Sequence, residues 1–258
     1  MEMTNMPLPF LEETIEIPSY LTDDSAHLGI SALFKLLQEA SERHASLLGA
    51  GWYELQERGY FWVVSRIQLK IHQLPKWRDK ILLRTWVKPS EAATSPRDFE
   101  IEDMEGRPLA SARALWAIID TEHNRPQRMN MFDGLFAPQD RSAIGQKPIK
   151  IPPVLHPDIL YGPKDVVFSD IDMNHHVNNA HYIQWTFDAM NEEFRKTHRL
   201  SDMTVNFIAQ AKLGEQYKVL TEQISATEFR TSIVSGDNLS EYCRIQSRWE
   251  PVILNEHH

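Results

Sequence analysis

The segment DVVFSDIDMNHHVNNAHYIQWTFDAMNEEF, residues 165–194, decides the fold because an earlier segment repeats its order of features. The earlier segment is TIEIPSYLTDDSAHLGISALFKLLQEASERHASLLG, residues 14–49. Each contains a short apolar run, a polar loop with aspartate, a histidine and then a helix-like sequence. At one constant offset three positions match: Asp23 with Asp172, Ser25 with Asn174, and His27 with His176. This shared order predicts that the chain contains two copies of one structural unit.

Both segments predict an amphipathic helix, because their apolar residues recur at helical spacing. The stripe of the first helix is Leu33, Leu36, Leu37, Ala40, His44, Leu47 and Leu48. The stripe of the second is Ile183, Phe187, Met190 and Phe194. We interpret His44, which lies on an apolar stripe, as a core histidine rather than a metal ligand.

The sequence after each helix predicts antiparallel strands, because β-branched and aromatic runs are separated by turn residues. KILLRTWV (80–87) is such a run in the first half, and QYKVLTEQI (216–224) is one in the second. MEGR (104–107) and SGDN (235–238) predict hairpin turns. The last strand of each half carries a tryptophan, Trp116 and Trp249.

One helix followed by four or five antiparallel strands predicts a sheet that wraps around the helix. The fold class is therefore α+β, a tandem (double) hotdog with two antiparallel sheets, each wrapping a long central helix. We expect an N-terminal hotdog domain at 1–122, a linker at 123–158 that is rich in proline and charge and lies across the surface, and a C-terminal hotdog domain at 159–258 that carries the polar cluster.

Composition narrows the functional classes. The chain of 258 residues has 27 Lys and Arg against 36 Asp and Glu, a net charge of -9, which argues against a nucleic-acid binder with a broad basic face. With one cysteine, Cys243, it forms no internal disulfide. No apolar run reaches the roughly 20 residues of a membrane span. The N-terminal residues resemble no targeting peptide, so we expect a cytoplasmic protein.

Two segments of the sequence resemble motifs of a known family. SDIDMNHHVNNAHYIQW (169–185) is similar to the signature of the acyl-acyl-carrier-protein thioesterases, in which Asp-x-Asn-x-His and Val-Asn-Asn lead into the helix of the second hotdog domain. LPKWRDKILLRTWV (74–87) resembles the Pro-x-Trp-Gly-Asp strand pair of the same family. The sequence departs from the family in two places. Arg78 replaces a glycine, and Gln210 and Ala211 stand where an acidic residue, sometimes followed by cysteine, is expected.

The resemblance implies an activity and a set of catalytic residues. The family hydrolyses fatty acyl-carrier-protein thioesters to free fatty acid and holo carrier protein in fatty acid biosynthesis, without a cofactor. Asp172, Asn174 and His176 match its catalytic positions. Two alternatives stay open: an acyl-CoA thioesterase of the hotdog superfamily, and a non-catalytic acyl-binding module, which the glutamine at 210 favours. A homodimer is possible.

The spacing of the cluster agrees with that chemistry. If the segment is extended, Asp170, Asp172, Asn174 and His176 share one side and His175 points away. We assign Asp172 as base or nucleophile, His176 as acid/base and carbonyl orienter, and Asn174 as positioner. Gln210 is a candidate for holding water. The backbone N–H groups at the helix start, Val177, Asn178 and Asn179, are candidates for stabilising the oxyanion.

Two other interpretations of the cluster remain. Asp and Asn before a helix are common caps. A metal could also be held by residues among Asp170, Asp172, His175, His176 and His181, although a second histidine at helical spacing is lacking.

Three expectations concern the rest of the chain. In the first half, Asp23, Ser25 and His27 should be catalytically silent, with Asp23 or Ser25 capping the helix and His27 bonded locally. The acyl chain should lie in an apolar pocket between helix and sheet, with much of its wall from the first half. Basic candidates for contact with an acidic carrier protein are Lys76, Arg78 and Lys80, and in the linker Arg125, Arg128, Lys147 and Lys150.

Overall fold

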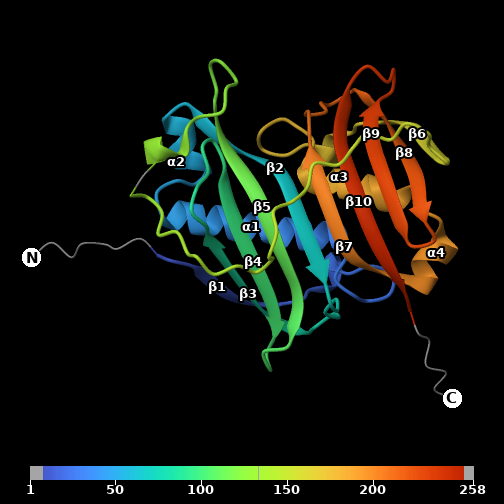
Figure 1. The fold of residues 1–258 in the computed structure, drawn as a ribbon, viewed down its shortest axis with the longest axis horizontal. Helices are drawn as coiled ribbons and strands as arrows, with labels where there is room; N and C mark the ends of the chain where they lie inside the picture. Colours follow the sequence, from blue (N-terminus) through green and yellow to red (C-terminus); the bar gives the residue numbers. More distant parts are fainter. Residues whose placement is uncertain (1–7, 133, 253–258) are drawn as a thin grey trace, which may run out of the picture. The chain divides into compact units, whose positions relative to one another are not determined.

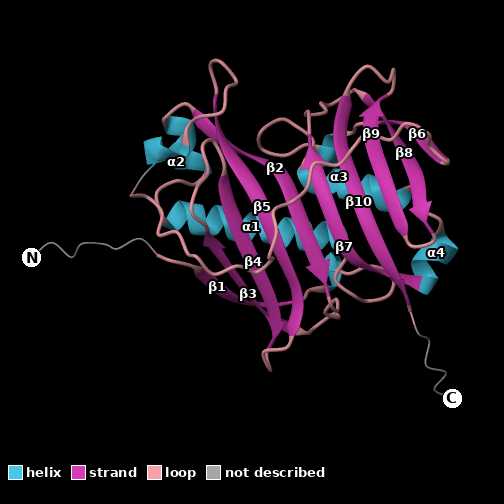
Figure 2. Cartoon of the chain, viewed as in Figure 1, coloured by secondary structure: helices cyan, strands magenta, loops and turns pink. Residues whose placement is uncertain are grey.

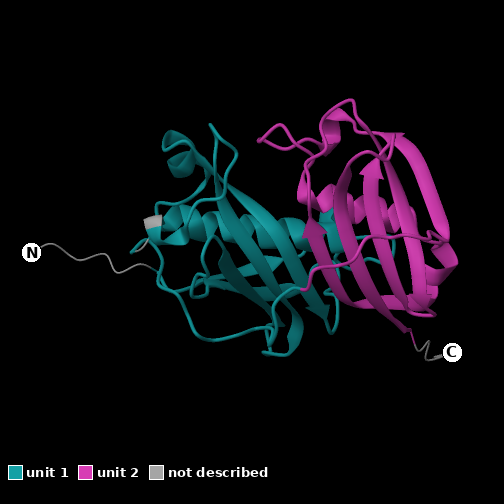
Figure 3. Cartoon of the chain, turned by 45° about the horizontal axis from the view of Figure 1, so that its top comes forward, with its two compact units in different colours: residues 1–148 teal, residues 149–258 magenta. Residues whose placement is uncertain are grey.

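The computed structural model describes residues 8–132 and 134–252. The chain forms two compact units, Met1–Pro148 and Ile149–His258 (Figure 3). The division falls inside the segment for which the sequence predicts a linker. Each unit is an antiparallel sheet with a helix against one face, which is the hotdog arrangement that the repeat predicts (Figure 2).

Unit 1 contains five strands in the order β1-β3-β4-β5-β2. Their bounds are β1 Leu11–Glu16, β2 Tyr60–Ile71, β3 Lys80–Val87, β4 Ser95–Asp103 and β5 Pro108–Asp120. The long helix α1 (Ile30–Leu47) runs across the sheet, and the short α2 (Trp52–Glu57) follows it (Figure 1). Strand β3 coincides with the predicted run, and the MEGR turn joins β4 to β5, so both predictions are confirmed.

Helix α1 buries most of the predicted stripe. Leu33, Leu37, Ala40 and His44 are buried, as the helical spacing requires. Leu47 is 66% exposed, so its place on the buried stripe was wrong, because the buried face at the end of the helix is made by His44, Ala45 and Leu48 instead. The N-cap is Gly29, which contributes no side chain, so the prediction that Asp23 or Ser25 caps this helix was also wrong.

Unit 2 contains five strands in the order β7-β10-β9-β8-β6. Their bounds are β6 Ile159–Asp165, β7 His198–Phe207, β8 Gln216–Ser225, β9 Glu228–Ser235 and β10 Glu241–Pro251. The SGDN turn joins β9 to β10 as predicted. Strand β6 ends at Asp165, and a 3-10 helix, η3, covers Phe168–Asp170.

The helix of unit 2 is shorter than predicted. Helix α3 (Asn179–Asp188) ends before Phe194, which lies instead on a separate helix, α4 (Glu192–Thr197). Asn191 starts α4 by accepting a hydrogen bond from the Phe194 amide at 3.0 Å. Phe194 still packs inward, with its ring 5.5 Å from that of Trp249. The single stripe from Ile183 to Phe194 is therefore two helices that bury parts of the same core.

The segment after β5 packs against unit 1 rather than only crossing its surface. Met129 and Phe132, on the 3-10 helix η2 (Met129–Phe132), join a core cluster with Leu55 and Ile118. A buried ion pair, Asp98–Arg113, links β4 to β5, and the amide of Ala143 donates to Asp98 Oδ2 at 2.8 Å. The apolar contacts of Met129 and Phe132 and the hydrogen bond of Ala143 together hold this segment to the sheet.

Candidate active site

The polar cluster forms a tight turn between η3 and α3. The Asp172 amide donates to the His176 carbonyl at 2.9 Å, and the His175 amide donates to the Asp172 carbonyl at 3.0 Å. His175 has a left-handed backbone, with φ 61°, and its side chain is exposed. Ile171 and Val177 pair as an isolated antiparallel bridge that closes the turn. The extended segment predicted from the spacing was therefore wrong, because the backbone reverses within these residues.

The two carboxylate oxygens of Asp172 have different surroundings. Its Oδ1 accepts the Asn174 amide at 2.8 Å, which is the local bond that aspartate typically makes in turns. Its Oδ2 accepts no hydrogen bond from the described residues. Since the side chain is half-buried, that oxygen can bind a water molecule or a substrate group.

His176 carries a buried nitrogen without a partner. Within the described part of the chain, its Nδ1 is shielded from solvent and makes no hydrogen bond. Burial lowers the pKa of His176, and Lys212 and His175 lower it further, while the Asp172 carboxylate raises it. The imidazole is therefore neutral at pH 7 and can either accept or donate a proton.

Asp170 occupies a different environment from the one predicted. Its side chain is buried, with Oδ2 accepting the Val167 amide at 2.9 Å and Oδ1 lying 3.0 Å from His181 Nδ1 on α3. Its carbonyl accepts the Asn178 amide at 2.9 Å. Asp170 therefore positions the start of α3 rather than sharing a face with Asp172. The sequence analysis gave this residue no such role.

Gln210 lies on the loop after β7, beside the turn. Its neighbour Ala211 accepts the Val177 amide at 3.1 Å, and the Ala211 amide donates to Tyr182 Oη at 2.9 Å. Gln210 itself is exposed. The loop is thus held to both the turn and α3 by one residue. Tyr182, which is 2% exposed, is a positioning residue that the sequence analysis missed, because it is not among the residues of the predicted stripe.

The three amides at the helix start differ in availability. The amide of Val177 donates to Ala211 and that of Asn178 to Asp170, so both are engaged. The Asn179 amide makes no hydrogen bond to any described residue, as the first position of a helix allows. Of the three, only the Asn179 N–H can bind an oxyanion without breaking an existing bond.

The structure gives less support to the interpretation of the cluster as a helix cap or as a metal site. Asn178 is the cap of α3, its Oδ1 accepting the Ala180 amide at 2.9 Å, so Asp172 and Asn174 are not needed for capping. In residues 8–132 and 134–252, no group of three or more His, Cys, Asp or Glu side chains is arranged to hold a metal ion.

The first half contains the same turn with its histidine engaged. The Asp23 amide donates to the His27 carbonyl at 2.8 Å, and Ala26 has φ 59°. His27 Nδ1 donates to the Ser25 carbonyl at 2.9 Å and lies 3.0 Å from Ser25 Oγ, which confirms the predicted local bonding. Ser25 Oγ also donates to Asp23 Oδ1 at 2.6 Å. Ser25 therefore engages the imidazole Nδ1, whose equivalent on His176 makes no hydrogen bond to the described residues.

Two family models match most of the chain. Residues 10–133 match the acyl-ACP thioesterase N-terminal domain, and residues 162–251 match the C-terminal domain of the same family. The chain belongs to the acyl-ACP thioesterase family. The resemblance inferred from residues 169–185 and 74–87 is thereby confirmed.

Relatives and solved structures agree with this assignment. The chain is 26% identical over 260 residues to a chloroplastic dodecanoyl-acyl-carrier-protein hydrolase of Cinnamomum camphora, covering 94% of this chain and 68% of the relative. It is 25% identical to oleoyl-acyl carrier protein thioesterase 1 of Arabidopsis thaliana, covering 91% and 70%. An acyl-ACP thioesterase structure from Bacteroides thetaiotaomicron matches with TM-score 0.85 at 24% identity, covering 94% of this chain and 98% of that one.

A second structure, the 12:0-ACP thioesterase from Umbellularia californica, has TM-score 0.83 at 24% identity, covering 94% and 98%. These two structures confirm the tandem hotdog fold. None of the described helices is long and apolar enough to cross a membrane.

Proposed function

We propose that this protein hydrolyses fatty acyl thioesters of acyl carrier protein, with the chemistry at the turn 172–176. The observation that carries the proposal is the buried, unpartnered Nδ1 of His176 on a turn whose other copy uses the equivalent nitrogen internally. A buried polar atom without a partner costs stability, so a binding role explains its retention.

In the proposed mechanism the turn supplies the base and the acid, and the start of α3 supplies the N–H that stabilises the oxyanion. Asp172 Oδ2 binds a water molecule and takes its proton as the oxygen attacks the thioester carbonyl. The N–H of Asn179, at the positive end of α3, donates to the oxygen that becomes negative. The proton that Asp172 took then passes to neutral His176, and when the carbon–sulfur bond breaks the imidazolium gives it to the leaving thiolate, so that Asp172 is again ionised and His176 again neutral. Free acid and thiol are the products.

Asn174 and Gln210 have supporting roles in this proposal. The Asn174 amide fixes Asp172 Oδ1, so the remaining oxygen keeps a constant direction. Gln210 stands where the family pattern has an acidic residue, and its amide can donate to and accept from water without adding charge. In this proposal Gln210 helps to hold the attacking water, and Asp172 is the carboxylate that takes its proton.

The partner proposal is a carrier protein bound through basic side chains. Lys76 and Arg78 are exposed on the loop before β3, and Lys80 is exposed as the first residue of that strand. The Arg78 guanidinium carbon lies 4.4 Å from the ring centroid of exposed Trp77. Arg78 has φ 70°, which explains why a glycine suits this position in the family pattern. In the linker, Lys147 already pairs with Glu91. The loop 76–80 is therefore the better candidate for contact with an acidic partner.

A cytoplasmic location and a homodimer remain predictions from the sequence, which fractionation and light scattering would test.

Thiol release from purified protein tests the proposed function. We expect dodecanoyl- or oleoyl-acyl carrier protein to release free thiol with a higher kcat/KM than the matching acyl-CoA. A preference for acyl-CoA would favour the acyl-CoA thioesterase alternative. Saturable binding of acyl-carrier protein without thiol release would favour the non-catalytic module.

A further inference from the structure

The loop 208–215, between β7 and β8, carries Gln210 beside the turn 172–176. The amides of its first two residues donate to the Tyr242 carbonyl, at 2.9 Å and 3.2 Å. In the middle of the loop, the Ala211 carbonyl accepts the Val177 amide at 3.1 Å. These backbone bonds attach the loop both to β10 and to the turn.

Two buried tyrosine hydroxyls add side-chain bonds to this loop. Tyr182 Oη, on α3, accepts the Ala211 amide at 2.9 Å. Tyr242 Oη, on β10, donates to Glu215 Oε2 at 2.9 Å, and the same oxygen accepts the Lys212 amide at 3.0 Å. The two tyrosines are 2% and 4% exposed, and burial raises the pKa of both phenols, so both keep their protons. The hydroxyls therefore restrain the two residues that follow Gln210.

The loop 72–79 of unit 1, between β2 and β3, has the same backbone bonds. The amides of its first two residues donate to the Leu109 carbonyl, at 2.9 Å and 3.1 Å. The Pro75 carbonyl accepts the Leu28 amide at 2.8 Å, as Ala211 accepts that of Val177. At the end of the loop, Asp79 Oδ2 accepts the Lys76 amide at 2.8 Å, as Glu215 accepts that of Lys212. The loop thus keeps its shape in unit 1 without a tyrosine.

Leucine occupies both tyrosine positions in unit 1. The offset that pairs Asp23 with Asp172 also pairs Leu33 with Tyr182, and the matching strand bonds pair Leu109 with Tyr242. Both leucines are buried, so an apolar side chain satisfies the packing at these positions. Taking a hydroxyl out of water costs free energy. Packing therefore does not explain why the hydroxyls are present in the copy that carries the candidate site.

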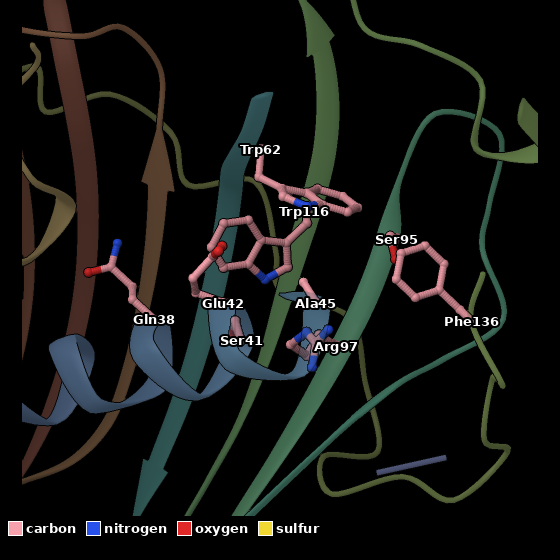
Figure 4. Close-up of a pocket in the computed structure, with 9 residues that line it drawn as sticks. All are labelled: Gln38, Ser41, Glu42, Ala45, Trp62, Ser95, Arg97, Trp116 and Phe136. Atoms are coloured by element: carbon pink, nitrogen blue, oxygen red, sulfur yellow. The ribbon is translucent and has the colours of Figure 1, made fainter. Parts of the chain in front are cut away.

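The cavity of unit 1 makes no use of the loop 72–79. It lies between α1 and the strands β2, β4 and β5 (Figure 4), and its lining is polar and aromatic where the sequence predicts an apolar pocket. Trp116 lines it, and the Nε1 of this residue is buried and makes no hydrogen bond to the described residues. Among the described residues that line this cavity, none belongs to 72–79. The loop of unit 1 therefore has no side chain to position there.

We infer that the hydroxyls of Tyr182 and Tyr242 are positioning groups, which hold the loop 208–215 so that Gln210 keeps one place beside the turn 172–176. Tyr182 acts through the Ala211 amide, and Tyr242 acts through the Glu215 carboxylate. The inference rests on the proposed function for the task of Gln210, which is to help hold the attacking water. A fixed loop places that water without a loss of order during the reaction.

Amide hydrogen exchange of the full chain tests the hold on the loop without any substrate. Tyr182→Phe removes one hydroxyl and leaves the ring, so the Ala211 amide should exchange at least about tenfold faster. Tyr242→Phe should do the same for the Lys212 amide. Thr186→Val is the matched control, because this buried hydroxyl of α3 donates to the Tyr182 carbonyl within the helix, at 2.9 Å. Unchanged exchange of both loop amides in the two Phe variants would overturn the inference.

Steady-state kinetics test whether the loop matters for turnover. Tyr182→Phe and Tyr242→Phe should each lower kcat for acyl-carrier protein at least about tenfold, with KM nearly unchanged, because both hydroxyls bond the loop and not the substrate. Thr186→Val should keep the wild-type kcat. Equal kcat in the wild type and both Phe variants would overturn the inference and leave the thioesterase function intact. Should Tyr182→Phe misfold, Tyr242→Phe decides alone, since it acts at the other end of the loop.

A double-mutant cycle separates positioning from a general effect on stability. If Tyr182 acts through Gln210, then adding Tyr182→Phe to Gln210→Ala should cost less than about twofold in kcat. The same loss in both backgrounds would show that Tyr182 acts independently of Gln210, against the inference. A wild-type protein that turns over no acyl-carrier protein would refute the proposed function, and the exchange measurement would still decide whether the two hydroxyls hold the loop.

Discussion

Asp23 and Asp172 occupy the same position in two copies of one turn. Each amide donates to the carbonyl of the histidine four residues later, at 2.8 Å and 2.9 Å, and each Oδ1 accepts the amide two residues later. The three residues between aspartate and histidine differ, and the middle one is Ser25 in the first copy and Asn174 in the second. The pair therefore provides a control inside the same molecule for each mutation of the proposed site.

Asp172→Asn should lower kcat/KM at least about a hundredfold, because the asparagine oxygen can still accept the Asn174 amide while the base is lost. Asp23→Asn should leave turnover near the wild-type value. Steady-state kinetics with circular dichroism would check both. Near-normal turnover of a folded Asp172→Asn protein would exclude Asp172 as the base.

His176→Ala should lose at least about a hundredfold in turnover, while His27→Ala should remain active with a lower melting temperature. Because burial lowers the pKa of His176 from 6.5, the acid limb of kcat/KM due to protonation of this residue should have its midpoint below pH 6.5. A midpoint above that value, or equal loss of activity in both variants, would contradict the assignment.

His44 should make the protein less stable in acid. Burial lowers its pKa from 6.5 to about 4, so between these values the unfolded state binds more protons than the folded state. Stability due to this residue is complete above pH 6.5 and is lost as the pH falls to 4. Over this range the free energy of unfolding falls by about 3 kcal/mol. Urea unfolding across this range should show a shallower pH dependence for His44→Gln; parallel curves would refute the prediction.

Cys243 should react slowly with a thiol reagent in the native protein. The residue is fully buried, and burial raises the pKa of its thiol, so little nucleophilic thiolate forms. Ellman's reagent should release close to one equivalent only after unfolding. Rapid labelling of the native protein would show that the β10 strand opens readily.

Salt should weaken turnover of carrier-protein substrates if the loop 76–80 binds them. Reversing Lys76 and Arg78 together to glutamate should raise KM and flatten the salt dependence of kcat/KM. Lys196→Glu is the control, because Lys196 pairs with Glu192 and Glu193 on α4. Unchanged kinetics of the double variant would remove this loop from the interface.

The sequence predicted the helices and strands whose residues repeat at a regular spacing. Strand β3 and both hairpins followed directly from their sequences, and α1 from its stripe. The end of α3 was missed because Phe194 continues the helical spacing even though the chain breaks and restarts at Asn191. An asparagine followed by two glutamates is a helix-start signal that could have marked the break.

The shape of the candidate site was not predictable from the sequence. The family resemblance singled out Asp172, Asn174 and His176, and their assignment to catalysis stays a prediction, while the reversal of the backbone depends on hydrogen bonds that an alternating pattern does not encode. The roles of Asp170 and Tyr182 depend on partners elsewhere in the fold, His181 and Ala211. The unmatched N–H of Trp116 likewise emerges only when its surroundings are known.

The hydrogen bond from the Ala143 amide to Asp98, which is paired with Arg113, has a practical consequence for dividing the protein. A fragment that ended at residue 122 would expose this ion pair and remove Met129 and Phe132 from their core cluster. Breaking up the surroundings of a buried charge is costly, so such a fragment should aggregate on expression. An independently expressed first half therefore needs to extend to Pro148, where the compact unit ends.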